Sequence, residues 1–148
     1  MTSYPDPLLP LALIPQVALK SMNQTHREEV ALINALAARV AMGMDGEADE
    51  QAVTDQLEAL LAHTRQHFAR ENELMLQHGF PAYPVHSAEH QRVLGLLETL
   101  LQGWLEEKRL SPLVDFLFTE WPAWFDNHLL TMDKVTAGFL RQQGVEPE

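Results

Sequence analysis

Apolar residues recur at steps of three and four along four long segments of the chain, which is the spacing of amphipathic α-helices. The segments cover about residues 17–42, 49–78, 85–108 and 112–142. Pro122 falls inside the fourth segment, where it should kink the helix or restart it near Glu120 and Trp121. Short loops join the segments, and β-type alternation never extends beyond a few residues. The pattern predicts an all-α fold, an up-down-up-down four-helix bundle with ligand sites facing its axis.

The chain of 148 residues is long enough for one hydrophobic core and short for two domains. Before the first segment, an apolar run is interrupted at Pro10 and closed at Pro15, far short of the roughly 20 residues of a membrane helix. We therefore expect an N-terminal arm over residues 1–15, a bundle over residues 16–142 and a C-terminal tail over residues 143–148.

The composition excludes several classes of partner and site. Ten Lys and Arg residues against 21 Asp and Glu residues give a formal net charge of −11, which disfavours nucleic acids and anionic membranes as partners. The absence of Cys excludes disulfides, thiolate zinc sites, iron–sulfur clusters and thioether-linked haem. Any metal must therefore be bound by His and carboxylates. Because the first basic residue is Lys20, the start does not resemble a secretory or transit peptide, and we expect a cytoplasmic location.

Two pairs of potential metal ligands are spaced i, i+4 on two of the expected helices. The pairs are His67 with Glu71, and His86 with His90. Each pair projects from one helix face with Cβ atoms about 5–6 Å apart, which suits one metal ion or two neighbouring ones. With His26 and His128, every helix would contribute an inward imidazole. Spacing alone leaves open both a metal site and ordinary histidines of the core or surface.

Longer stretches around these residues resemble the hemerythrin family. They are Met22-Asn23-Gln24-Thr25-His26, His67-Phe68-Ala69-Arg70-Glu71, Gly79-Phe80-Pro81, His86-Ser87-Ala88-Glu89-His90 and Trp124-Phe125-Asp126-Asn127-His128 followed by Asp133. The resemblance spans about residues 26–133, and the combined spacing is far more specific than any one stretch. It implies a four-helix bundle, in agreement with the apolar pattern, and two iron ions per chain with an oxo or hydroxo bridge.

The resemblance also implies seven metal ligands. One iron would be bound by His86, His90 and His128, the other by His26 and His67, and Glu71 and Asp133 would bridge them. Asp133 lies five residues after His128, about 140° around an ideal helix. The two side chains must therefore converge from different directions, or the helix must be distorted locally.

This ligand set leaves the two irons unequal. Three imidazoles, two carboxylate oxygens and the bridge would fill all six coordination positions of one iron. The iron with two imidazoles would have five ligands and one open position. The sequence has no Glu-x-x-His motif of the kind found in glutamate-rich di-iron bundles. An asymmetrically open metal pair without a water-activating motif favours O₂ chemistry over hydrolysis. The resemblance implies that the open iron binds O₂ reversibly.

Reversible O₂ binding needs an apolar pocket that is poor in protons. Sequence neighbours of two of the expected ligands should form its wall, namely Phe68, Trp124, Phe125 and Leu129.

Glu29 departs from the family pattern, which usually has an apolar residue three positions after the histidine of the first helix. We expect it to face the metal pair, as an extra ligand or as a proton donor, with a solvated position beside Glu28 as the alternative. His63 lies one turn before His67 and is expected behind the ligands or at the edge of the core.

Three functions remain open at this point. The first is a cytoplasmic di-iron protein that binds O₂ as a carrier, store or sensor, and we favour it over an enzyme. The second is a di-iron enzyme acting on peroxide or NO, with Glu29 as proton donor or extra ligand. The third is a bundle with a structural metal or none. The sequence does not decide between a monomer and a homo-oligomer.

Overall fold

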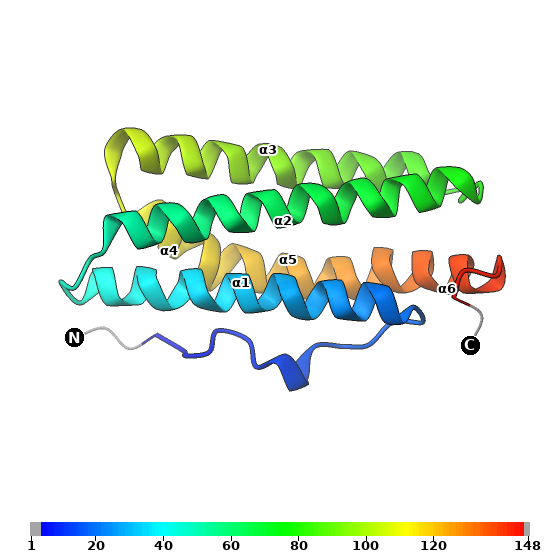
Figure 1. Cartoon of the computed structure of the whole chain (residues 1–148), viewed down its shortest axis with the longest axis horizontal. Coiled ribbons are helices and arrows are strands. Elements are labelled where there is room, and N and C mark those ends of the chain that lie inside the picture. The colour runs from blue at the N-terminus through cyan, green and yellow to red at the C-terminus, as the bar shows by residue number, and fades with distance from the viewer. Residues whose placement is uncertain (1–3, 147–148) are drawn as a thin grey trace.

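The computed structural model describes residues 4–146, and the regular structure in that range is entirely helical. Three long helices are followed by a fourth helical rod, each antiparallel to the one before it (Figure 1). The long helices are α1 (Lys20–Met44), α2 (Glu50–Gln77) and α3 (Tyr83–Glu107). The predicted all-α, up-down-up-down four-helix bundle with an N-terminal arm is confirmed. Within residues 4–146, none of the helices is long and apolar enough to cross a membrane.

The fourth rod is a continuous helix with two π-helical turns in it. Its α-helical parts are α4 (Ser111–Asp115), α5 (Trp121–His128) and α6 (Lys134–Gln142), and the π turns are Phe116–Glu120 and Leu129–Asp133. Each π turn closes with a hydrogen bond to the carbonyl five residues earlier, from Trp121 N–H to Phe116 and from Lys134 N–H to Leu129. The rod restarts as an α-helix at Trp121, immediately before Pro122, as the sequence predicts.

The helix ends lie within a few residues of the predicted ones. Asp49 caps α2 by accepting a hydrogen bond from Ala52 N–H at 3.0 Å, and Gly79 follows the helix with a left-handed φ of +66°. The first helix begins later than the periodicity suggested. The Asn23 side chain explains this, because it pairs with both the N–H and the C=O of Val17, at 2.8 and 3.0 Å, and keeps that residue outside the helix.

The segment before α1 runs along that helix (Figure 1) and contains one short 3₁₀ turn, Leu11–Leu13. The Asn34 side chain of α1 fixes it by binding the N–H and the C=O of Leu9, at 2.9 and 2.8 Å. Ile14 and Leu19 of the same segment are buried. Residues 1–3 of the predicted arm and residues 147–148 of the predicted tail lie outside the described residues.

The interior of the bundle is divided into two halves. Near the α1–α2 loop it is filled by aliphatic and aromatic side chains, among them Val40, Val53, Leu57, Trp104 and Leu117. In the other half, where α1 begins and α2 ends, the inward positions are occupied by histidines and carboxylates. The apolar half therefore provides a core that does not depend on the polar cluster.

Candidate metal centre

The seven residues implied as ligands are buried together inside the bundle. They are His26, His67, Glu71, His86, His90, His128 and Asp133, each with an exposed fraction of 7% or less. Burying ionisable groups is unfavourable unless each is paired or bound to an ion. The cluster therefore requires compensating interactions within the bundle.

Helix geometry explains how these side chains meet. The two i, i+4 pairs each lie on one face of α2 or α3, at the level of His26 on α1. Asp133 reaches the same side of its rod as His128 because the π turn between them brings residues five apart into register. The Asp133 Oδ1 atom lies 3.1 Å from His128 Nε2. The local helix distortion considered from the spacing is present.

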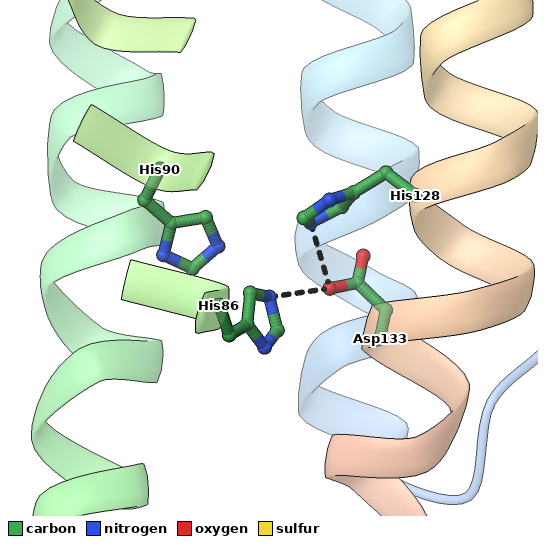
Figure 2. A group of neighbouring side chains, drawn as sticks. All are labelled: His86, His90, His128 and Asp133. Atoms are coloured by element: carbon green, nitrogen blue, oxygen red, sulfur yellow. Dashed lines mark ion pairs between the residues drawn. The ribbon is translucent and has the colours of Figure 1, made fainter. Parts of the chain in front are cut away.

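The potential ligand atoms form two groups, within each of which all atoms lie less than 4.8 Å apart. We call the first the three-histidine group; it consists of His86, His90, His128 and Asp133 (Figure 2). We call the second the two-histidine group; it consists of His26, His67 and Glu71.

Glu71 lies between the two groups and directs one oxygen to each. Its Oε2 atom is 2.7 Å from His67 Nε2 in the two-histidine group. Its Oε1 atom is 3.3 Å from His90 Nε2 and 3.8 Å from His86 Nε2 in the three-histidine group.

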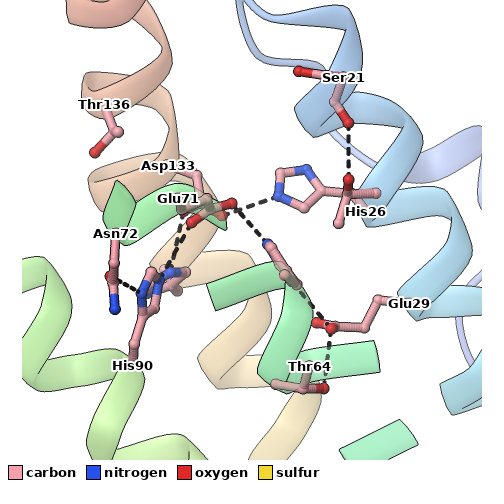
Figure 3. A network of polar contacts seen from close by, with 12 residues as sticks. Ser21, His26, Glu29, Thr64, Glu71, Asn72, His90, Asp133 and Thr136 are labelled. Carbon is pink, nitrogen blue, oxygen red and sulfur yellow. Dashed lines mark hydrogen bonds and ion pairs between the residues drawn. The ribbon is translucent and has the colours of Figure 1, made fainter. Parts of the chain in front are cut away.

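Asp133 has a matching arrangement, and its ion pair with His26 is drawn in Figure 3. Its Oδ2 atom is 3.1 Å from His26 Nε2, and its Oδ1 atom is 3.3 Å from His86 Nε2. Both carboxylates thus direct separate oxygens to the two histidine groups.

Unpaired polar atoms indicate what these residues can hold. Among the described residues, seven buried side-chain nitrogen or oxygen atoms have no hydrogen-bond partner. Five of them face the three-histidine group: Nε2 of His86, His90 and His128, Oε1 of Glu71 and Oδ1 of Asp133. Leaving one such atom unpaired costs about 1–3 kcal/mol. A cation bound among them would give such atoms a partner, and nitrogen and oxygen donors of this kind suit iron, zinc, copper or nickel.

The two carboxylates are ionised in this environment. Burial and the nearby Asp133 raise the pKa of Glu71, but the charge and hydrogen bond of His67 outweigh both, so the net pKa lies below its usual value. Burial also raises the pKa of Asp133, but the close contacts of its carboxylate with His128 and His26 more than offset it, so the net pKa lies well below its usual value. Two buried negative charges favour the binding of cations between them.

Two of the imidazoles are held from behind by neutral acceptors. His86 Nδ1 donates to Thr136 Oγ1 at 2.8 Å, and His90 Nδ1 donates to Asn72 Oδ1 at 2.9 Å. An imidazole that carries its proton on Nδ1 presents the lone pair of Nε2 to a metal. Sequence reasoning missed both acceptors, and no spacing rule points to them.

Glu29 is buried, with an exposed fraction of 3%, and lies on the outer side of His67. Its Oε1 atom accepts a hydrogen bond from His67 Nδ1 at 3.1 Å and lies 3.0 Å from Thr64 Oγ1 and 3.3 Å from His63 Nδ1. The alternative of a solvated side chain beside Glu28 is wrong. Burial raises the pKa of Glu29, but His67 and His63 outweigh it, and the net pKa falls below the usual range.

His63 connects Glu29 to the surface and belongs to neither ligand group. Its Nδ1 atom is 3.3 Å from Glu29 Oε1, and its Nε2 atom is 3.3 Å from Oε1 of the exposed Glu28. The hydrogen bond to Glu29 raises the pKa of His63 above its usual value, although burial acts in the opposite direction. A protonated His63 can donate to both carboxylates at once.

Of the four residues expected to form the apolar wall, three lie against imidazole rings. These ring contacts are Phe68 with His90 at 3.9 Å between centroids, Trp124 with His128 at 4.6 Å and Phe125 with His26 at 6.0 Å. The fourth, Leu129, is fully buried. These contacts shield the histidines from water on several sides.

A small hollow of about 10 Å³ lies in the bundle, and none of the seven histidine and carboxylate residues of the cluster lines it. Its wall includes Phe68, Trp121 and Trp124, together with Glu29 and Thr64. This volume is roughly that needed for one water molecule. The hollow therefore has room for only a very small guest.

Comparisons with known proteins agree with this geometry. The model of the hemerythrin HHE cation binding domain matches residues 17–140. A bacteriohemerythrin of Aquifex aeolicus (strain VF5) is 34% identical over 116 residues, which cover 78% of this chain and 85% of that protein. A bacteriohemerythrin of Ralstonia nicotianae (strain ATCC BAA-1114 / GMI1000) is 33% identical over 119 residues, covering 80% of this chain and 79% of that protein.

Solved structures show the same fold at lower sequence identity. A crystal structure of a hemerythrin mutant superposes with a TM-score of 0.73 at 21% identity, covering 87% of this chain and 98% of that one. The crystal structure of a further mutant protein superposes with a TM-score of 0.72 at 22% identity and the same coverage. At this identity the likeness concerns the fold alone.

Proposed function

This chain belongs to the hemerythrin family, and from that premise we propose that it is a non-haem di-iron protein that binds O₂ at one open iron position. The proposed cofactor is a pair of iron ions with an oxo or hydroxo bridge. When bound, this pair would supply the redox chemistry and the open position for O₂.

One observation supports the proposal most directly. Glu71 and Asp133 each direct one carboxylate oxygen to the three-histidine group and the other to the two-histidine group. We assign His86, His90 and His128 to one iron, His26 and His67 to the other, and the two carboxylates to both. Two metal positions with three and two imidazoles are unequal, and the position with fewer ligands is the one open to a small molecule.

The surrounding residues suit reversible binding. Phe68, Trp124 and Phe125 pack against the imidazoles, and Leu129 is fully buried. These apolar side chains limit the access of water, which would otherwise supply protons that promote oxidation of the metal.

The position of Glu29 favours this function over an enzyme that acts on peroxide or NO. That alternative used Glu29 as a proton donor or as an additional ligand. Its Oε1 atom instead accepts a hydrogen bond on the outer side of His67, and its pKa is lowered. Glu29 therefore contacts the proposed ligand His67 on the side opposite to the atom, Nε2, that faces Glu71.

An anaerobic O₂ titration tests the function. Protein purified after growth with iron is analysed for metal, reduced under argon and titrated with O₂ while its absorption spectrum is followed. We expect two irons per chain and a coloured form that disappears when O₂ is removed and returns when it is added again. Continuous consumption of peroxide or NO would support the enzyme, and zinc without an O₂ response would support a structural metal.

The remaining parts of the function follow from the family and from charge. We propose O₂ as the ligand, in a role as carrier, store or sensor. The charge of −11 disfavours nucleic acids and anionic membranes as partners, and we propose a cytoplasmic location.

A further inference from the structure

The two histidine groups differ in the hydrogen-bond partners of their imidazole Nδ1 atoms. In the three-histidine group, His86 Nδ1 contacts the neutral Thr136 hydroxyl, His90 Nδ1 contacts the neutral Asn72 amide oxygen, and His128 Nδ1 has no hydrogen-bond partner within residues 4–146. In the two-histidine group, His67 Nδ1 donates to the buried carboxylate of Glu29. The charged acceptor therefore lies behind the group that offers fewer imidazoles.

We infer that Glu29 is a positioning residue that orients His67 and strengthens metal binding specifically at the two-histidine position. The inference rests on the proposed function, since it concerns one of the two proposed metal positions. A carboxylate behind a ligating imidazole fixes the ring orientation and makes Nε2 a more basic ligand, whereas a neutral acceptor does so more weakly. Glu29 would thereby offset the missing third imidazole.

Glu29 is itself held in place by Thr64, which is not a proposed ligand (Figure 3), and by His63. The Thr64 hydroxyl lies 3.0 Å from Glu29 Oε1 and 2.8 Å from the Leu60 carbonyl, and it has one proton to share between them. Because a carboxylate is the stronger acceptor, we expect this proton to favour Glu29. His63 Nδ1 approaches the same oxygen from the surface side, at 3.3 Å.

A fully structural role for Glu29 would have a different consequence. A buried carboxylate that only completes a polar network would affect folding stability, and its removal would not distinguish between the two metal positions. Removal of an acceptor that orients a ligand lowers metal affinity by about 10–100-fold at the position concerned. Selectivity between the positions therefore separates the two roles.

The experiment measures iron retention in competition with a chelator. Wild type, Glu29→Gln and Glu29→Leu are loaded with iron(II) under argon and dialysed against increasing concentrations of an iron chelator, and iron per chain is then determined. We expect Glu29→Leu to lose one of its two irons at roughly 10–100-fold lower chelator concentration than wild type. The second iron should be retained as in wild type. Glu29→Gln keeps an acceptor oxygen and should show an intermediate loss.

A matched control variant and a double variant show which of the two metal positions is affected. Asn72→Leu removes the neutral acceptor of His90 and should weaken the iron of the three-histidine group instead. His26→Ala removes a ligand of the two-histidine group, so adding Glu29→Leu to it should not change retention of the remaining iron. A further loss in that double variant would contradict the inference.

The outcomes are distinguishable from failure of the proposed function. Wild type that binds no iron, or a single iron, would refute the di-iron proposal itself. Two irons in wild type, with both lost together or neither weakened in Glu29→Leu, would overturn the role of Glu29 alone. Circular dichroism and urea unfolding of the metal-free proteins report folding separately, and Glu29→Gln carries the test if Glu29→Leu does not fold.

Discussion

The ring of Phe68 lies parallel to the imidazole of His90, with 3.9 Å between centroids and 6° between the planes. Phe68 is 1% exposed and belongs to α2, whereas His90 belongs to α3. The contact therefore joins two helices as well as covering one face of a proposed ligand. This double role links the core of the bundle to its metal centre.

Phe68→Ala should destabilise the metal-free protein by about 3–5 kcal/mol, because it removes a buried aromatic ring and leaves a cavity. Phe68→Leu keeps most of the volume and should cost clearly less. Urea unfolding followed by circular dichroism measures both variants. Equal stability of Phe68→Ala and wild type would contradict the packing described for this ring.

Glu71→Ala should bind fewer than two metal ions per chain, because it removes the Oε2 atom near His67 and the Oε1 atom near His90. Metal analysis after loading with iron(II) measures the stoichiometry. Glu73→Ala, which changes an exposed carboxylate on the same helix, should still bind two. Retention of two irons by Glu71→Ala would exclude Glu71 as a bridge.

Removal of metal by a chelator should leave the bundle helical but loosen one half of it. The apolar half, with Leu57, Trp104 and Leu117, retains its packing without any ion. In the polar half, unpaired atoms of His86, His128 and Asp133 would remain buried, and that half should open more readily. Hydrogen exchange should therefore accelerate around α5 and α6 more than in the first half of α2. A random-coil circular dichroism spectrum would contradict this expectation.

The fold could be predicted from the sequence because the apolar spacing that defines a long helix is repeated by many residues. The apolar spacing predicted the four rods, and Pro122 predicted the restart at Trp121. The later start of α1 was not predictable, because it depends on one side chain, Asn23, that binds the Val17 backbone. A single local contact of this kind leaves no periodic signal.

The candidate site could be predicted from the sequence only in part. The i, i+4 pairs indicated which faces of α2 and α3 carry ligands, but Asp133 required the family resemblance, because its approach depends on a π turn. The acceptors Thr136 and Asn72 had no signal in the sequence. For Glu29, helical spacing could not separate an inward position from an outward one, since a small rotation of α1 exchanges them.

The pH dependence of stability should reveal the network between Glu28, His63 and Glu29. The hydrogen bond to Glu29 raises the pKa of His63 in the folded protein, despite the opposing effect of burial. A histidine whose folded pKa is raised stabilises the protein fully below its unfolded pKa, about 6.5, and loses this contribution as the pH rises through the folded pKa. The reason is that only protonated His63 donates to both carboxylates.

Metal-free wild type and His63→Gln should therefore differ most in unfolding free energy on the acidic side of pH 6.5, above the range where carboxylates take up protons. The difference should shrink as the pH is raised through the folded pKa of His63. Urea unfolding over a series of pH values measures it, and His78→Gln, which lies outside this network at the end of α2, serves as the matched control. A difference that grows with rising pH would show that His63 is held neutral, and Glu29 would then be kept ionised by His67 and Thr64 without a cation on the surface side.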